Sequence, residues 1–328
     1  MPDVMLVGSI PHNSTPEAMA MFGEPLGAHL KTIPDGEVGM RRFWISRVHF
    51  QVLALHPDLE IIQRPRKDDR VVFGHAGWRL GFYQDALNSY HFFKHLQEKG
   101  QIPKHVRFQV SMPSPVSALP PRVFPTPGDL AKVRPGYIDA ARAEVQAIIK
   151  HIPAHELAIQ WDCSTELQDA YGSIAGLDAA QMLERNIPQL RDVSKDIPKE
   201  VELGFHLCFG TLGGWPRFAP DSTNKGAELA QAIIGNMGRQ VDWVHIPVLD
   251  RSDQAYYEPL SVLRDSKTRI YLGMIHSMET FAARYKAAKA VLPNVGVAAY
   301  CGFGRRSPDE LKQILNDHLT ALDIMERG

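Results

Sequence analysis

A histidine and two cysteines give the sequence its clearest signal of metal chemistry. His206 and Cys208 lie two positions apart in a segment rich in Val, Leu and Phe, and Cys301 ends another apolar segment. In a β-strand, residues i and i+2 point to the same side, so the imidazole and the thiol would face one cavity. Three nitrogen and sulfur ligands with an open fourth position are typical of a catalytic zinc site. The alternative is that the cysteines pack as small apolar side chains, because free cysteines are often buried.

The elements that would position these residues alternate along the chain. Short apolar segments, typical of strands covered on both faces, occupy residues 4–9, 29–33, 106–110, 157–162, 201–208, 241–246, 269–275 and 295–301. Helical patterns lie between most of them, at 16–22, 137–152, 179–193, 225–238, 278–291 and 308–326. This alternation predicts an α/β fold, a single (β/α)8 TIM barrel formed by residues 1–328. A doubly wound sheet is the alternative, but no Gly-x-Gly-x-x-Gly motif follows the first segment.

The interval between the second and third predicted strands is much longer than an ordinary connection. It contains helical patterns at 43–55 and 84–99, and a hairpin-like pattern formed by 71–74 and 78–83. We expect residues 38–104 to form a long insertion over the catalytic mouth of the barrel, and not a separate domain.

The catalytic residues of such barrels lie where strands end and the following loops begin. Polar residues at the predicted strand ends are therefore candidates: Gly8, Ser9, Asp35, Glu37, Ser111, Asp162, Glu166, His245, Asp250, His276 and Arg305. Ser111 is a candidate for binding substrate, and His276 is a candidate catalytic residue that could move a proton at the mouth. Arg305 follows the last strand, where barrels bind anions, and this position favours an acidic substrate.

Five short motifs at the strand ends stand in a distinctive order. They are Val7-Gly8-Ser9-Ile10-Pro11, Asp35-Gly36-Glu37 with Arg41, Ile159-Gln160-Trp161-Asp162, His206-Leu207-Cys208, and Tyr300-Cys301-Gly302-Phe303-Gly304-Arg305. Together they resemble the catalytic, C-terminal half of cobalamin-independent methionine synthase, within the uroporphyrinogen decarboxylase/methionine synthase-like barrel superfamily. The resemblance extends from residue 7 to residue 305 and implies a zinc-dependent methyl transferase on a TIM barrel.

The resemblance implies a metal role for the histidine and the two cysteines. His206, Cys208 and Cys301 would bind Zn²⁺, which lowers the pKa of a bound substrate thiol so that the thiolate can attack an alkyl carbon. The family carries a fourth ligand, a glutamate at the end of the sixth strand, and no glutamate stands in that register here. His245 or Asp250 could take its place, water could fill the position, or the metal could be lost.

The resemblance also implies how the substrate is held. Glu37 and Asp162 match residues that bind the amino group of the family's amino-acid thiol, and they would orient the thiol for reaction. Gly8 and Ser9 match the segment that meets the carboxylate of that substrate. Arg41 belongs to the same matching motif as Glu37, so it is a further candidate for binding substrate.

Two departures from the family bear on the reaction. Cys163 follows Asp162 where the family carries a second carboxylate, which alters the pocket beside Asp162. The family's folate-binding N-terminal half has no counterpart in these 328 residues. We therefore do not expect a full-length, folate-dependent methionine synthase.

Composition excludes several other classes. The chain has 36 Lys and Arg against 37 Asp and Glu, a balance that argues against a polyanion-binding surface and so against nucleic acid as a partner. No apolar run is long enough to cross a bilayer, and no signal-peptide pattern opens the sequence. The three cysteines are odd in number and widely spaced, a pattern that does not predict a disulfide framework. We expect a cytoplasmic protein without a membrane partner.

These observations predict a zinc-dependent methyl or alkyl transferase that activates a small thiol. Its partners would be the thiol and an alkyl or methyl donor, which could be a methylated small molecule, a methylcorrinoid protein, or an activated ether, sulfonium or epoxide. A second hypothesis is a zinc-dependent lyase, hydrolase or decarboxylase on the same barrel, which would turn over without a thiol. A third is a metal-free small-molecule binding protein, in which the cysteines matter only for stability.

Overall fold

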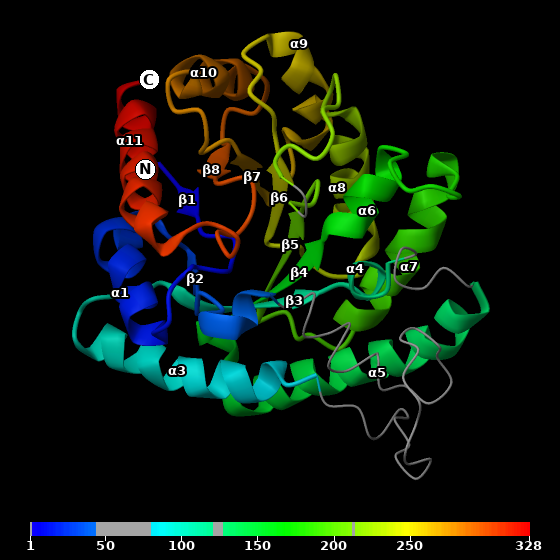
Figure 1. The fold of residues 1–328 in the computed structure, drawn as a ribbon, viewed down its shortest axis with the longest axis horizontal. Helices are drawn as coiled ribbons and strands as arrows, with labels where there is room; N and C mark the ends of the chain where they lie inside the picture. The colour runs from blue at the N-terminus through cyan, green and yellow to red at the C-terminus, as the bar shows by residue number, and fades with distance from the viewer. Residues whose placement is uncertain (1, 44–79, 121–126, 212–213) are drawn as a thin grey trace.

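The computed structural model of the protein describes residues 2–43, 80–120, 127–211 and 214–328. In these ranges eight parallel strands form a nearly closed barrel surrounded by helices (Figure 1). The strands are β1 (Val4–Met5), β2 (Thr32–Pro34), β3 (Arg107–Pro113), β4 (Leu157–Cys163), β5 (Glu202–Leu207), β6 (Trp243–Pro247), β7 (Arg269–Gly273) and β8 (Gly296–Ala298). Their order in the sheet is β1-β8-β7-β6-β5-β4-β3-β2. This arrangement confirms the predicted (β/α)8 barrel.

The helices pack around the barrel as a ring that closes on itself. Its members are α1 (Thr15–Leu26), α3 (Phe82–Glu98), α5 (Pro127–His151), α7 (Met182–Ser194), α8 (Asn224–Asn236), α9 (Gln254–Tyr257) with η7 (Glu258–Leu263), α10 (Phe281–Val291) and α11 (Leu311–Arg327). Each member contacts the next in that order, and α11 packs against α1 (Figure 1). No helix in the described ranges is long and apolar enough to cross a membrane.

Shorter helices occupy the connections between these elements. They are η1 (Gly27–His29), η2 (Gly39–Phe43), α4 (Pro115–Ala118), η5 (Ala154–Glu156), α6 (Ser164–Ala170), η6 (Ala179–Gln181) and η8 (Pro308–Glu310). Helices α4 and α6 directly follow β3 and β4, so they lie at the carboxyl ends of the strands. The sequence patterns did not predict either of them.

Helix α3 occupies the place in the ring between β2 and β3. It packs against α1 on one side and α5 on the other, as the ordinary helix of this barrel position would. Residues 80–104 of the predicted 38–104 insertion therefore include a ring helix. Residues 44–79 lie outside the described residues, so a covering over the mouth stays a prediction.

The floor of the barrel is filled by two aromatic side chains. The Trp243 indole from β6 lies over Gly204 of β5, where a built Cβ would stand only 1.8 Å from the ring. Tyr271 from β7 is buried beside it, with Met5 and Ala298 in the same cluster. Because only glycine leaves room for the indole at position 204, the floor is packed shut and ligands must enter from the other end.

A layer of side-chain amides separates this floor from the mouth. The Gln109 and Gln160 amides both donate to the Val7 carbonyl, at 3.1 and 2.8 Å. The Leu6 carbonyl accepts from Gln109 as well. Side-chain amides thus replace the ladder partners of β1 above Met5, which explains why that strand is shorter than the predicted 4–9.

The barrel has a seam between β1 and β2, which share no ladder in the described residues. The loops above the two strands close it instead. The Ile10 amide donates to the Gly36 carbonyl at 2.6 Å, and the Gly39 amide donates to the His12 carbonyl at 2.8 Å. The Ser9 hydroxyl also donates to the Glu37 carboxylate across the seam.

Candidate active site at the barrel mouth

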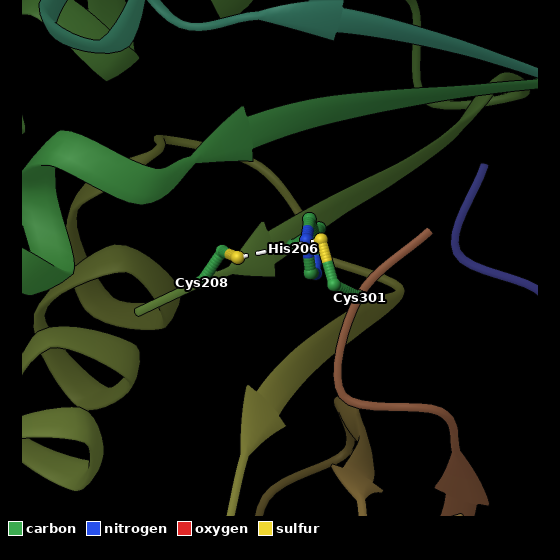
Figure 2. A group of neighbouring side chains, drawn as sticks. All are labelled: His206, Cys208 and Cys301. Atoms are coloured by element: carbon green, nitrogen blue, oxygen red, sulfur yellow. Dashed lines mark hydrogen bonds between the residues drawn. The ribbon is translucent and has the colours of Figure 1, made fainter. Parts of the chain in front are cut away.

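His206, Cys208 and Cys301 meet at the carboxyl ends of β5 and β8. Figure 2 shows His206 on β5, Cys208 just beyond it, and Cys301 on the segment after β8. One possible ligand atom from each lies within 4.8 Å of the other two, and the two sulfurs are 3.5 Å apart. A tetrahedral zinc ion with Zn–S bonds of ~2.3 Å holds two thiolates about 3.8 Å apart, so the spacing of the donors fits zinc.

A hydrogen bond joins the two thiols of this group. The Cys208 thiol donates to the Cys301 sulfur, and this hydrogen bond holds the pKa of Cys301 well below its ordinary value. His206 also lowers the pKa of Cys301. The same hydrogen bond and burial raise the pKa of Cys208. The Cys208 hydrogen bond and His206 thus favour the thiolate form of Cys301, and a thiolate is the form that binds soft metal ions.

Neither residue considered as a fourth ligand faces these donors. His245 stands beside His206 on the neighbouring strand β6, and both of its ring nitrogens already have partners: His206 Nδ1 at 2.8 Å and the Ala299 carbonyl at 3.0 Å. Asp250 is exposed, accepts from Thr280 at 2.5 Å, and lies 3.3 Å from Arg284. The described residues thus offer three candidate protein ligands, a number that would leave a position for substrate on a bound zinc ion.

Glu37 reaches the site from a turn after β2 that is held by hydrogen bonds to Asp35. Asp35 is buried and accepts from the Glu37 amide at 2.7 Å and from Arg41 at 2.5 Å. Gly36 has φ 81° and Glu37 has φ 46°, both in the left-handed region. A side chain at position 36 would also stand 3.3 Å from Ile10. The Asp-Gly-Glu motif therefore directs the Glu37 carboxylate into the cavity. The left-handed backbone conformation of Glu37 costs conformational energy.

Asp162 is the second carboxylate of the site and comes from β4. The Gln160 amide donates to it at 2.9 Å, which links Asp162 to the amide layer below. Burial raises the pKa of Asp162 to about 6. Burial and the nearby Asp162 raise the pKa of Glu37 to about 8. The two acids repel each other when both are ionised, so a bound cation would relieve them.

One cavity joins the carboxylates to the Cys and His side chains. Of the residues that sequence reasoning singled out, the lining includes Gly8, Ser9, Glu37, Asp162, His206, Cys208, Cys301 and Arg305. It also includes residues that were not predicted: Arg42, Phe43, Gln168, Thr211 and Arg217. Thr211 and Arg217 lie beyond β5, so the rule that barrel sites include the loops after strands could have found them.

Other predicted residues lie outside this cavity. Arg41 and Ser111 line an adjoining small pocket that shares Glu37, and Arg41 is bound to Asp35 there. His276 and Asp250 line a second, larger cavity, which meets the first at Thr211 and Arg305. The His276 ring contacts the Val248 carbonyl at 2.9 Å, and burial lowers its pKa to about 4. A histidine that is neutral at pH 7 is a weak proton donor.

Comparison with solved structures relates this arrangement to other proteins. A Listeria monocytogenes protein described as a candidate vitamin-B12-independent methionine synthase matches with a TM-score of 0.58 and 16% identity, over 99% of both chains. A methyltransferase from Methanosarcina mazei matches with a TM-score of 0.54 and 12% identity, over 98% of this chain and 94% of that one. The chain has the fold of these two proteins. That fold is the one implied by the sequence resemblance to the methionine synthase-like barrels.

Searches at the level of sequence found no such relationship. No protein-family model matches the chain, and no curated protein matches it. The structural likeness therefore establishes the architecture, and the chemistry has to be argued from the side chains at the mouth.

Proposed function

We propose that this protein is a zinc-dependent methyl or alkyl transferase whose nucleophile is a small amino-acid thiol. The observation that carries the proposal is the pairing of two unlike groups in one cavity. His206, Cys208 and Cys301 form one group, and Glu37 and Asp162 form the other. A thiol with an amino group on the same small molecule is the ligand class that can engage both at once.

Three side chains would hold the metal. The donor set of one imidazole and two thiols suits zinc, and the spacing of the sulfurs agrees with a tetrahedral ion. Bound zinc supplies the chemistry of a Lewis acid, which lowers the pKa of a thiol so that a thiolate nucleophile exists at neutral pH.

The rest of the site would bind and orient the thiol substrate. Glu37 and Asp162 would accept hydrogen bonds from its ammonium group, and the exchange of their mutual repulsion for two ion pairs would favour binding. Ser9 and the backbone at Gly8 line the same cavity and would contact its carboxylate. Holding the sulfur in line with the donor carbon would then provide the orientation that alkyl transfer needs.

The donor would approach from the mouth, where Thr211 and Arg305 connect the two cavities. Arg305 donates to Thr211, and no described carboxylate forms an ion pair with it. It would therefore attract an anionic portion of the donor. A methylated small molecule or a methylcorrinoid protein is consistent with this access. A cytoplasmic location belongs to the same proposal.

Metal analysis tests the proposal first. We expect about one zinc ion per chain in purified wild-type protein, and loss of that zinc in both Cys208→Ser and Cys301→Ser. Cys163→Ser is the matched control, because Cys163 is buried and donates to the Trp161 carbonyl outside the cavity. Wild-type protein that stays metal-free after expression with ample zinc would overturn the metal site.

A second experiment separates the transferase from the other hypotheses. Zinc-loaded protein is incubated with methyl iodide and a small amino-acid thiol, and the S-methyl product is followed by mass spectrometry. The proposal expects product formation above the protein-free rate, and loss of that increase in Cys208→Ser. Turnover of a substrate with no thiol present would instead favour a lyase or hydrolase.

A further inference from the structure

We infer that Arg42, Arg217 and Arg305 form a binding site for a doubly charged anionic group, of the phosphate or phosphonate class, on a small-molecule donor. This inference rests on the proposed function, in which a donor enters from the mouth, and it names a chemical group that the donor carries. The three arginines belong to segments that follow three different strands, β2, β5 and β8. All three line the cavity that also holds Cys301.

These arginines lack the carboxylate partners that most of the described arginines have. In the described ranges most arginines form an ion pair with Asp or Glu, and these include Arg41 and Arg306, the sequence neighbours of Arg42 and Arg305. Arg42, Arg217 and Arg305 form no such pair with any residue that the structure describes. Three guanidinium charges therefore line one cavity without a paired carboxylate, an arrangement that attracts an anion.

A close approach of two loops places Arg305 beside Arg42. A Cβ built on Gly304 would stand 3.1 Å from the Arg42 carbonyl oxygen and 2.9 Å from the Ser9 Cβ. Only glycine at this position leaves the loop after β8 enough room to lie against both residues. Because Arg305 directly follows Gly304, its backbone is held close to that of Arg42.

Arg217 and Arg305 meet at the segment that follows β5. The Arg305 guanidinium donates to the Thr211 hydroxyl, and Arg217 Cδ lies 3.8 Å from a Cβ built on the neighbouring Gly210. Since the Thr211 oxygen accepts from Arg305, its own hydrogen remains available to donate to a bound anion. Arg305 therefore links the other two arginines, and Thr211 adds a hydroxyl donor at the point where the two cavities meet.

The charge of this arrangement favours a phosphate over a carboxylate. Glu37 and Asp162 are the carboxylates that line the cavity in the described residues, and the proposed function assigns both to the ammonium group of the thiol. A carboxylate or sulfonate has a single negative charge, whereas a phosphate monoester has about two at neutral pH and three acceptor oxygens. Each of three guanidinium groups can then donate to a different oxygen of the same phosphate.

Calorimetric titration with inorganic phosphate tests the inference. It is done at low ionic strength, where screening is weak, and on wild-type protein before and after treatment with a zinc chelator, because phosphate can also bind to a metal. We expect phosphate to bind both preparations, and Arg305→Gln to weaken its affinity by roughly 10-fold. Arg42→Gln and Arg217→Gln should each weaken it by about 3-fold or more. Acetate, with one charge, should bind wild type at least about 10-fold more weakly than phosphate.

Arg306→Gln is the matched control for these variants. Arg306 is exposed, as Arg305 is, but it forms an ion pair with Glu310 and lies outside this cavity. Its removal changes the net charge of the protein by the same amount, so phosphate affinity should stay within about 2-fold of wild type. Equal losses of affinity in Arg305→Gln and Arg306→Gln would overturn the inference. So would a wild type that binds phosphate no more tightly than acetate.

Kinetics with methyl iodide separates this inference from the proposed function, because methyl iodide carries no anionic group. Methyl transfer by a wild type that does not bind phosphate would overturn the anion site and leave the transferase standing. Phosphate binding that depends on Arg305, in a wild type without zinc or transfer, would support the anion site and defeat the transferase. If Arg305→Gln raised KM for the amino-acid thiol and left phosphate binding unchanged, Arg305 would hold the carboxylate of the thiol, and the inference would be wrong.

Discussion

The cavity has two walls that are built in opposite ways. The metal wall, formed by His206, Cys208 and Cys301, comes from β5 and β8 and is arranged by hydrogen bonds before any ligand arrives. The carboxylate wall, formed by Glu37 and Asp162, comes from β2 and β4. There the protein places two acids together, and within the described residues neither forms an ion pair, because Arg41 is bound to Asp35. The side chains of the metal wall are already paired with one another, whereas Glu37 and Asp162 each accept from a neutral donor, Ser9 and Gln160, and would gain a cation from a bound substrate.

This difference separates substrate recognition from thiol activation. Burial raises the pKa values of Glu37 and Asp162, with repulsion by Asp162 adding to the shift of Glu37, and a substrate ammonium would lower both values again. In the proposed enzyme the carboxylate wall would select a cationic ligand. The metal wall would select a thiol, because its donors suit a soft, thiol-binding ion. Changes to one wall should leave the function of the other measurable.

The largest expected effect is on transfer when the carboxylate wall loses Asp162. In Asp162→Asn we expect kcat/KM for the amino-acid thiol to fall by roughly 100-fold or more, since a lost buried ion pair costs about 2–5 kcal/mol. Zinc content should remain at the wild-type value. Both are measured on the same preparation, by product mass spectrometry and metal analysis.

Glu166→Gln provides the comparison for that variant. Glu166 is fully buried on α6 and accepts from Ser114 and Ser117, so it resembles Asp162 in burial but lies outside the cavity. Transfer should be unchanged in Glu166→Gln. Loss of zinc in Asp162→Asn would mean that the two walls are not separable.

A change of substrate should have the next largest effect. A thiol of the same length without an amino group should react with wild-type protein roughly 100-fold more slowly in kcat/KM, because the two carboxylates then face no cation. In Asp162→Asn the two thiols should differ by much less. Equal rates with wild-type protein would show that the carboxylate wall does not recognise an amine.

The pH dependence of transfer should change with Glu37. Its pKa of about 8 in the free protein means that the ionised, amine-binding form increases as pH rises from 7 to 9. We expect kcat/KM to rise across this interval by up to about 10-fold, and Glu37→Gln to flatten the rise at a lower value. A Glu37→Gln profile as steep as that of wild type would assign the rise to another group.

The same carboxyl group should also affect stability. Glu37 in the folded protein keeps a proton that the unfolded chain releases near its ordinary pKa of 4.5. The free energy of unfolding of the zinc-free protein should therefore decrease as pH rises from about 4.5 to about 8. Urea denaturation at pH 5.5 and pH 8 checks this, and Glu37→Gln should show a smaller decrease. A decrease in Glu37→Gln as large as that of wild type would contradict the raised pKa of Glu37.

The barrel and the metal wall could be predicted from the sequence because both depend on short, local sequence patterns. Strands β4, β5 and β7 form almost where their apolar runs indicate, and the spacing of His206 and Cys208 requires only the alternation of a strand. Strand β8 ends earlier than the predicted 295–301, because the carbonyl of Ala299 accepts from His245 in place of a ladder partner. This hydrogen bond joins residues that lie 54 positions apart, so no local sequence pattern could have predicted it.

Other parts of the site depend on such distant contacts throughout. The isolation of Arg41 from the cavity follows from its ion pair with Asp35, and the placement of His276 in the second cavity follows from the path of β7. The pairing of His206 with His245 follows from strand register. Each of these residues has a polar side chain at a strand end, so the sequence alone gives them equal standing with Asp162.

The seam between β1 and β2 has a mechanical consequence. Gly8 and Ser9 lie on one edge of it and Glu37 on the other, and all three line the cavity. A substrate that contacts Ser9 and Glu37 together would bridge β1 and β2 at the one seam in the described barrel. Substrate binding would then also close the barrel at that seam. Amide hydrogen exchange at Ile10 and Gly39, which donate across that gap, would slow when the thiol binds.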